Sequence, residues 1–214
     1  RNLPLSIRRQ RQMCIRDRYN EIKTYFKEGY MMIRQAHPSD NKRIAELCYM
    51  IWEDMELDIV NEISKERMMN ILDLSVVNVE YRSYYKNVWV YEVDGKVAGC
   101  VIAYDGKHEL DYEENWLKLP LDEDIRKYGT PLPVKEAADD EMYIETVATF
   151  PEYRGQGIAT QLMTYLLEMY SEKKWSLNCD YDNEKALGLY EKLGFKTVSD
   201  IDLYGHLYRH MIKQ

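Results

Sequence analysis

The sequence predicts one mixed α/β domain, with a mostly antiparallel central sheet of about seven strands flanked by helices. Strand and helix patterns mix along the chain without strict alternation, which is typical of a mixed sheet covered by helices. No internal repeat or linker divides the chain, and its 214 residues suffice for one medium domain with a hydrophobic core.

The first half of the chain predicts a strand, two helices and a hairpin. Residues 31–37 read as the strand, and Pro38 and Ser39 open the first helix, while the second follows Ser64. Two β-rich runs flank Asp94-Gly95, a pair that tolerates the positive φ angles of a type I′ turn. The expected core faces of the two helices carry Ile44, Leu47, Cys48 and Ile51, and Met68, Ile71 and Leu72.

An acidic insertion at about 105–140 separates this hairpin from the next strand. Residues 108–140 hold ten Asp and Glu against four Lys and Arg, and we expect a short helix near 121–128. Long excursions of this kind are often functional or disordered. The acids form either a wall of a binding site that favours cations or a solvated, solubilising face.

The second half predicts strands and helices in turn. Residues 141–150 read as a central strand, followed by a helix over 156–170 and a strand over 174–180. Asp182 can cap a helix that runs to Leu193 and ends at Gly194. Residues 195–199 and 203–213 would close the sheet.

Composition limits the classes of protein. About 45% of the residues are apolar, and no apolar stretch approaches the roughly 18 residues of a membrane span. The cysteines lie far apart and form no C-x-x-C pair, which predicts free thiols in a reducing cytoplasm and no zinc site. They are Cys14, Cys48, Cys100 and Cys179.

Charge is unevenly distributed. The first eighteen residues hold six arginines and one aspartate, a net of +5, so the remainder of this −8 chain carries −8 − 5 = −13. Such an acidic body repels phosphate backbones, which argues against nucleic acid as a partner. Residues 1–18 resemble translated sequencing-adapter read-through. The alternative is a basic targeting arm. We expect residues 1–30 to be a non-native or disordered leader and residues 31–214 to be the domain.

The junction "TVATFPEYRGQGIAT" at 146–160 predicts a phosphate site. Glycines let the backbone approach a ligand, and the first amides of a helix lack internal partners at its positive end. No P-loop is present, and Thr160 stands where a G-x-G-x-x-G fingerprint needs its third glycine. The pattern R-x-x-G-x-A fits fully, with Arg154, Gly157 and Ala159.

A second motif, "NEKALGLYEKLGF" at 183–195, follows after one strand. Asn183, Ala186 and Tyr190 share one helix face in this stretch, although they also fit a simple core stripe. With both motifs in this order, the chain resembles the GNAT superfamily of N-acetyltransferases from about Met32 to the C-terminus. The resemblance is strongest over 143–195.

The resemblance implies direct transfer of an acetyl group from acetyl-CoA to a primary amine of a small molecule or peptide. It implies that the fourth and fifth strands splay apart and that the coenzyme's pantetheine arm pairs with the backbone between them. The residues expected to bind the coenzyme are Val147, Ala148, Thr149, Arg154, Gly155, Gln156, Gly157, Ile158, Ala159, Thr160, Asn183 and Ala186. We expect no metal, and either a monomer or a homodimer.

Two residues are candidates for proton transfer. Tyr190 would protonate the leaving thiolate, and Glu145 would accept the amine proton directly or through water. Glu145 could instead bind a cationic substrate or pair with a lysine. His206 and His210 are expected on a strand and Cys179 in packing. The competing function is a sensor that binds acyl-CoA or a nucleotide without turnover.

Overall fold

The computed structural model describes residues 31–214, so the leader predicted at 1–30, with Cys14, lies outside the described residues. The predicted mixed sheet of seven strands is confirmed, in the order β1-β2-β3-β4-β5-β7-β6. All neighbours pair antiparallel except β4 and β5, which are parallel. The strands are β1 (Met31–Gln35), β2 (Val88–Val93), β3 (Lys96–Asp105), β4 (Met142–Thr149), β5 (Trp175–Asp180), β6 (Lys196–Leu203) and β7 (His206–Lys213).

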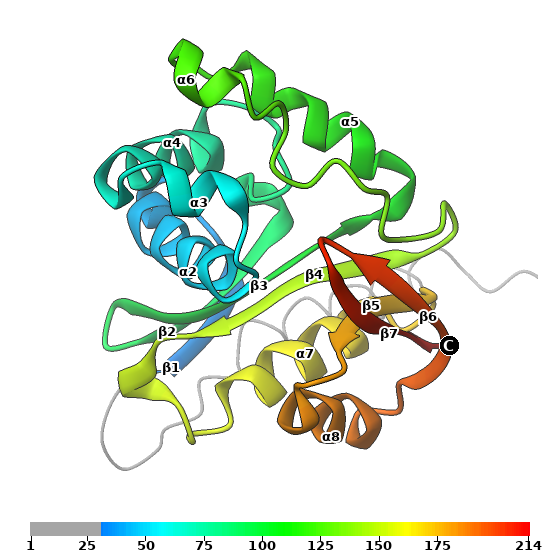
Figure 1. Ribbon diagram of the computed structural model, residues 1–214. Helices are drawn as coiled ribbons and strands as arrows, with labels where there is room; N and C mark the ends of the chain where they lie inside the picture. The colour runs from blue at the N-terminus through cyan, green and yellow to red at the C-terminus, as the bar shows by residue number, and fades with distance from the viewer. Residues whose placement is uncertain (1–30) are drawn as a thin grey trace, which may run out of the picture.

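Helices cover both faces of the sheet (Figure 1). One face carries α2 (Asn41–Asp54), α3 (Asp58–Glu62), α4 (Lys65–Val77), α5 (Glu109–Glu114) and α6 (Glu123–Arg126). The other carries α7 (Ile158–Met169) and α8 (Glu184–Lys192). Short 3-10 turns complete the described part: η1 (Pro38–Asp40), η2 (Tyr85–Asn87), η3 (Gly106–His108), η4 (Asn115–Lys118) and η5 (Pro151–Tyr153).

Each layer closes its own hydrophobic core. The core under α2 and α4 contains Ile44, Leu47, Met68 and Leu72, and the core under α7 contains Ile158, Leu162, Leu166 and Trp175. The predicted core faces of α2 and α4 are therefore confirmed, apart from Ile51, which is only partly buried. No helix within residues 31–214 is both long and apolar enough to cross a bilayer.

Strands β4 and β5 pair only at one end, as expected. Met142–Ile144 pairs with Trp175–Leu177, and no pairing continues beyond Ile144. In Figure 1 the two strands diverge from this point. The remaining residues of β4 therefore keep β3 as a neighbour on one edge and leave the other edge open.

A β-bulge lies inside β4 at Glu145. Ile102 pairs with Thr146 and Ala103 with Ile144, which leaves Glu145 as the extra residue. A bulge reverses the alternation of side chains. Tyr143 consequently packs in the core under α2, while Val147 packs against the core under α7.

The predicted boundaries differ from the structure at α7 and α8, and one further helix was not predicted. Helix α7 starts at Ile158, because Gly157 is left-handed at φ 76° and cannot continue the helical turn. Asn183 caps α8 by accepting from the Ala186 amide, so the prediction of Asp182 as the cap is wrong. The sequence pattern also missed α3, whose five residues are too few to show a helical period.

The acidic insertion is folded, and its acids divide between two environments. Glu109, Glu113 and Glu136 are buried, while the other seven acids are exposed. Glu109 accepts from the amides of Glu136 and Ala137, at 3.0 and 3.1 Å. The buried acids therefore tie the insertion to itself, a role that neither predicted alternative included.

Candidate active site

The turn before α7 presents free backbone donors. Gly155 and Gly157 both have positive φ, 79° and 76°, which side chains with a Cβ rarely adopt. Among described residues, no hydrogen-bond acceptor is found for the amides from Gly155 to Thr160. These donors lie at the N-terminal, positive end of α7, in an exposed turn suited to a phosphate group.

Arg154 connects this turn to the end of β4. Its side chain is exposed, and its Nε donates to the Thr149 carbonyl at 3.2 Å. Within residues 31–214, the two terminal nitrogens of the guanidinium have no carboxylate or carbonyl acceptor. The turn thus combines a formal positive charge with free amides.

Along the open edge of β4, the backbone peptide groups of alternate residues point into the gap. In an antiparallel ladder, every second residue pair exchanges hydrogen bonds. Phe150 donates its amide to the Ala98 carbonyl, so Ala148, two residues earlier, also hydrogen-bonds to its β3 partner Cys100. The peptide groups of Val147 and Thr149 therefore point into the gap toward β5. Of the three residues predicted to pair with an extended arm, Val147 and Thr149 face the gap, and Ala148 faces β3.

Helix α8 carries the second predicted group. The Asn183 Oδ1 is used within the chain, since it accepts from the Ala186 amide at 3.0 Å. The ring of Tyr190 packs edge-on against Phe195, with centroids 6.3 Å apart. The structure gives its hydroxyl no hydrogen-bond partner among residues 31–214. Burial, and to a lesser extent Cys179, raises the pKa of Tyr190 well above its ordinary value.

Glu145 lies on the opposite face, beside a buried arginine. Its carboxylate accepts a short hydrogen bond from the Tyr104 hydroxyl, and its Oε2 lies 3.6 Å from Arg82 Nη1. Burial raises the pKa of Glu145 to about 7, although Arg82 and the Tyr104 hydroxyl both act to lower it. Glu136 and Glu113 contribute further to the increase through like-charge repulsion.

Arg82 is the centre of this polar cluster and is itself fully buried. It contacts Glu109, Glu113, Glu136 and Glu145 at 3.1, 2.7, 3.6 and 3.6 Å. Sequence reasoning missed Arg82, because its partners lie far along the chain and no motif surrounds it. The only available signal was the excess of acids in the insertion, some of which need a buried cation.

The structure therefore separates the two predicted proton carriers. Glu145 joins the polar cluster under α2 and α5, whereas Tyr190 packs with the core under α7. The open part of β4 runs between these two faces. No contact joins Glu145 to Tyr190 in residues 31–214.

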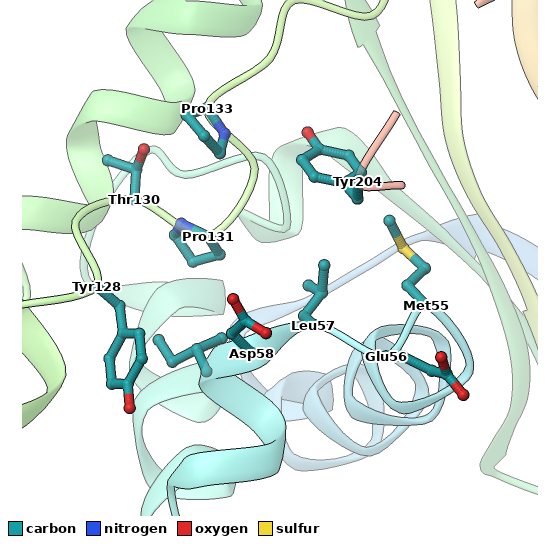
Figure 2. A pocket seen from close by; sticks show the side chains of 10 residues that line it. Met55, Glu56, Leu57, Asp58, Tyr128, Thr130, Pro131, Pro133 and Tyr204 are labelled. Carbon is teal, nitrogen blue, oxygen red and sulfur yellow. The ribbon is translucent and has the colours of Figure 1, made fainter. Parts of the chain in front are cut away.

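A pocket of about 350 Å³ opens on the face that carries Glu145 (Figure 2). Its walls come from the connection between α2 and α3 with the start of α3, from the insertion, and from the turn between β6 and β7. Figure 2 shows the Asp58 carboxylate beneath Pro131 and the Glu56 carboxylate directed away from it. The lining residues are Met55, Glu56, Leu57, Asp58, Ile59, Tyr128, Thr130, Pro131, Pro133 and Tyr204.

Tyr204 connects the pocket to the polar cluster. Its hydroxyl donates to Glu136 Oε1 at 3.0 Å, and that same oxygen lies 3.6 Å from Arg82 Nη1. The insertion borders the pocket with aromatic and proline side chains, while the pocket acids come from residues 56 and 58. The predicted acidic wall of the insertion is therefore not what lines this pocket.

The histidines and cysteines have ordinary partners. His206 and His210 lie on strand β7, as predicted, and His210 Nδ1 lies 2.8 Å from Asn178 Oδ1. Cys179 is buried and free, as are Cys48 and Cys100. Residues 31–214 hold no group of three or more side chains suited to a metal ion.

Comparisons with known proteins agree with this geometry. A crystal structure of an N-acetyltransferase from Staphylococcus aureus Mu50 is 55% identical, with a TM-score of 0.84 over 85% of this chain and 100% of that chain. A second acetyltransferase structure is 33% identical, with a TM-score of 0.73 over 86% and 98%.

The curated match is shorter. N-alpha-acetyltransferase 30 from Schizosaccharomyces pombe is 38% identical over 73 residues, which cover 33% of this chain. Those residues span 45% of that protein, less than half its length. The family model described as Acetyltransferase (GNAT) family matches residues 58–195, well over half of the sequence. The chain belongs to the GNAT family of acetyltransferases.

Proposed function

We propose that the protein transfers the acetyl group of acetyl-CoA directly to a primary amine. The observation that carries the proposal is the open edge of β4, which has Glu145 on one face and Tyr190 on the other. An extended thioester arm in this gap would meet a base and an acid on opposite sides. Acetyl-CoA supplies the activated acetyl group.

The free donors before α7 fit the diphosphate of acetyl-CoA. The space beside both glycines is open. A Cβ added at Gly155 would have no atom within 4 Å, and the nearest atom to a Cβ added at Gly157 would be the side-chain amide nitrogen of Gln161, at 3.8 Å. We assign the diphosphate to the amides of residues 155–160 with Arg154. Val147 and Thr149 would hold the pantetheine arm by backbone hydrogen bonds, as an added strand would be held. Asn183 and Ala186 would border that arm from α8.

Glu145 would remove the proton that blocks attack by the amine. A primary ammonium has a pKa near ~10, so it must lose a proton before its nitrogen becomes a nucleophile. A carboxylate whose pKa lies about 7 is a stronger base than an ordinary glutamate and is about half ionised at neutral pH. Ordered water between Glu145 and the amine would serve the same transfer.

Tyr190 would protonate the departing thiolate. Its raised pKa keeps the phenol protonated at neutral pH, and its hydroxyl has no described partner to compete for that proton. The backbone amide of Val147 or Thr149 would meanwhile donate to the thioester carbonyl and stabilise its developing negative charge. The two amides lie on the open edge of β4, and Tyr190 lies on the α7 side of the same gap.

The acceptor amine would enter through the pocket under Pro131. Its walls combine apolar surface with the Asp58 carboxylate, a composition suited to a cationic amine with a short apolar body. Tyr204 links this pocket to Glu136 and so to the cluster around Glu145. The acceptor class is therefore a small-molecule or peptide amine that is positively charged in water.

A panel of amines with thiol detection tests this function. We expect coenzyme A release that depends on both acetyl-CoA and a cationic amine, and none with acetyl-CoA alone. Mass analysis should find the acetyl group on the amine and not on the protein. Tight binding of acetyl-CoA with no thiol release from any amine would support the sensor function instead.

A further inference from the structure

The guanidinium of Arg82 bonds simultaneously to the acceptor-pocket wall and to the surroundings of Glu145. On the pocket side, Nη2 donates to the Leu132 carbonyl at 2.7 Å. The Leu132 amide in turn donates to Glu113 Oε1 at 2.6 Å, and Glu113 Oε2 accepts from Arg82 Nε at 2.7 Å. The amide and the carbonyl of Leu132, which lies between the lining residues Pro131 and Pro133, are thus both held by one buried ion pair.

On the other side, the same guanidinium reaches the proposed base. Nη1 donates to the Tyr104 hydroxyl at 2.8 Å, and that hydroxyl donates to Glu145. The charged and titratable groups around Glu145 come from every element packed against it. They are Cys48 from α2, Tyr81 and Arg82 from the loop after α4, Tyr104 from β3, Glu109 and Glu113 from α5, Glu136 from the insertion and Tyr143 from β4.

The guanidinium of Arg82 and the two prolines beside Leu132 make this part of the structure rigid. A planar guanidinium with five donors in a fixed fork holds several acceptors in set directions, which a lysine ammonium does not do. Leu132 lies between Pro131 and Pro133, so the wall has little freedom of its own. Displacing Arg82 would therefore move the pocket wall and release Tyr104 together.

We propose that Arg82 is a positioning residue that fixes the acceptor-pocket wall and the base Glu145 relative to each other. The inference rests on the proposed function, since it assigns the base and the pocket to one reaction. Arg82 acts on the pocket through Leu132, and on Glu145 through Tyr104 and through its own charge, 3.6 Å from the Glu145 carboxylate.

Two variants separate the two sides of this link. Glu113→Gln removes the ion pair that holds Leu132, so the KM for the amine should rise about tenfold. The same change removes a like charge that raises the pKa of Glu145, so the midpoint of kcat should move to lower pH, opposite to the next variant. Tyr104→Phe removes the hydroxyl that lowers the pKa of Glu145, so the midpoint of kcat should move to higher pH while the KM for the amine stays unchanged.

Arg82→Lys should raise the KM for the amine and, by releasing Tyr104, move the midpoint of kcat to higher pH, without a change in the Kd for acetyl-CoA. Arg67→Lys is the matched control, because Arg67 also pairs with two carboxylates, Asp122 and Asp124, but on the surface. It should change neither KM nor the pH midpoint. A folded Arg82→Lys with parental values for both would overturn the proposal.

Two spectroscopic readouts keep this test independent of turnover. Amide exchange at Leu132 should accelerate in Glu113→Gln, and a carboxyl NMR titration should show a higher pKa for Glu145 in Tyr104→Phe. If no amine is acetylated, the proposed function fails, and these readouts still decide whether Arg82 holds both sites. If Leu132 exchange and the Glu145 titration stay parental in the variants, Arg82 positions neither.

Discussion

The Tyr104 hydroxyl donates a hydrogen bond to the Glu145 carboxylate across paired strands β3 and β4. The bulge at Glu145 makes this contact possible, because it inserts an extra residue on the β4 side of the pairing. Burial nevertheless raises the pKa of Glu145 to about 7, so the group changes charge within the physiological range. Several measurable properties should follow that titration.

Turnover should depend on pH through Glu145. The base must be ionised, so kcat should rise with pH around 7 and level off above it. Glu145→Gln should lower kcat about 10²-fold or more at pH 7 and remove this acid limb. A pH profile of kcat on both proteins checks this. An unchanged profile in the variant would remove Glu145 from the mechanism.

Stability should depend on the same group, with the opposite sign from an ordinary carboxylate. The folded pKa is higher than the unfolded one, so folding favours the protonated form. The protonated Glu145 contributes its full stabilisation at pH values below the pKa of this group in the unfolded chain, and that contribution is lost as pH rises through about 7. The loss amounts to about 3 kcal/mol at most. Urea unfolding at pH 5 and pH 8 should show this decrease for the parent and a smaller one for Glu145→Gln.

Local sequence signals predicted the turn to which we assign the coenzyme diphosphate. Arg154, Gly157 and Ala159 lie within six residues, directly before and inside the first turn of α7. The face shared by Ala186 and Tyr190 was inferred from their spacing, and the splayed strands from the family resemblance. The splay is confirmed by the end of pairing at Ile144.

The acceptor side depends on contacts that no local pattern carries. Strict alternation would place Tyr143, Glu145 and Val147 on one face, but the bulge moves Val147 to the other. Arg82 meets Glu109 and Glu113 from 27 and 31 residues away, after the insertion has folded back. A single sequence gives neither the bulge nor this pairing.

Tyr190→Phe should lower turnover far more than it lowers affinity for acetyl-CoA. The phenyl ring keeps the edge contact with Phe195, and only the proton donor is lost. A missing general acid costs about 10²- to 10⁴-fold in rate. Steady-state kinetics and calorimetry with acetyl-CoA measure the two quantities separately. Equal kcat in variant and parent would exclude Tyr190 as the acid.

Gly157→Asp should abolish binding of acetyl-CoA. The new carboxylate would stand among the free amides and repel the diphosphate, and the side chain would oppose the positive φ of 76°. Gly95→Asp is the matched control, because Gly95 has the same φ of 76° in the β2–β3 turn. The control should bind as the parent does. Calorimetry that detects parental affinity in Gly157→Asp would refute this placement.

Asp58→Asn should weaken selection for cationic acceptors. The carboxylate lies beneath Pro131 inside the pocket, so its loss removes attraction for an ammonium group and leaves the apolar walls intact (Figure 2). Because Asp58 is exposed, we expect a rise of only about threefold to tenfold in the KM for a diamine, declining with added salt. The KM for a monoamine of equal length should change less.

Asp54→Asn supplies the comparison for Asp58, since Asp54 is an exposed acid at the end of α2 outside the pocket lining. Both changes remove one negative charge from the same region, so a general effect of net charge would raise the KM for the diamine equally in the two variants. A rise confined to Asp58→Asn would locate the attraction in the pocket. Equal values in the two variants would instead assign it to the acidic surface as a whole, because long-range fields act on any nearby cation.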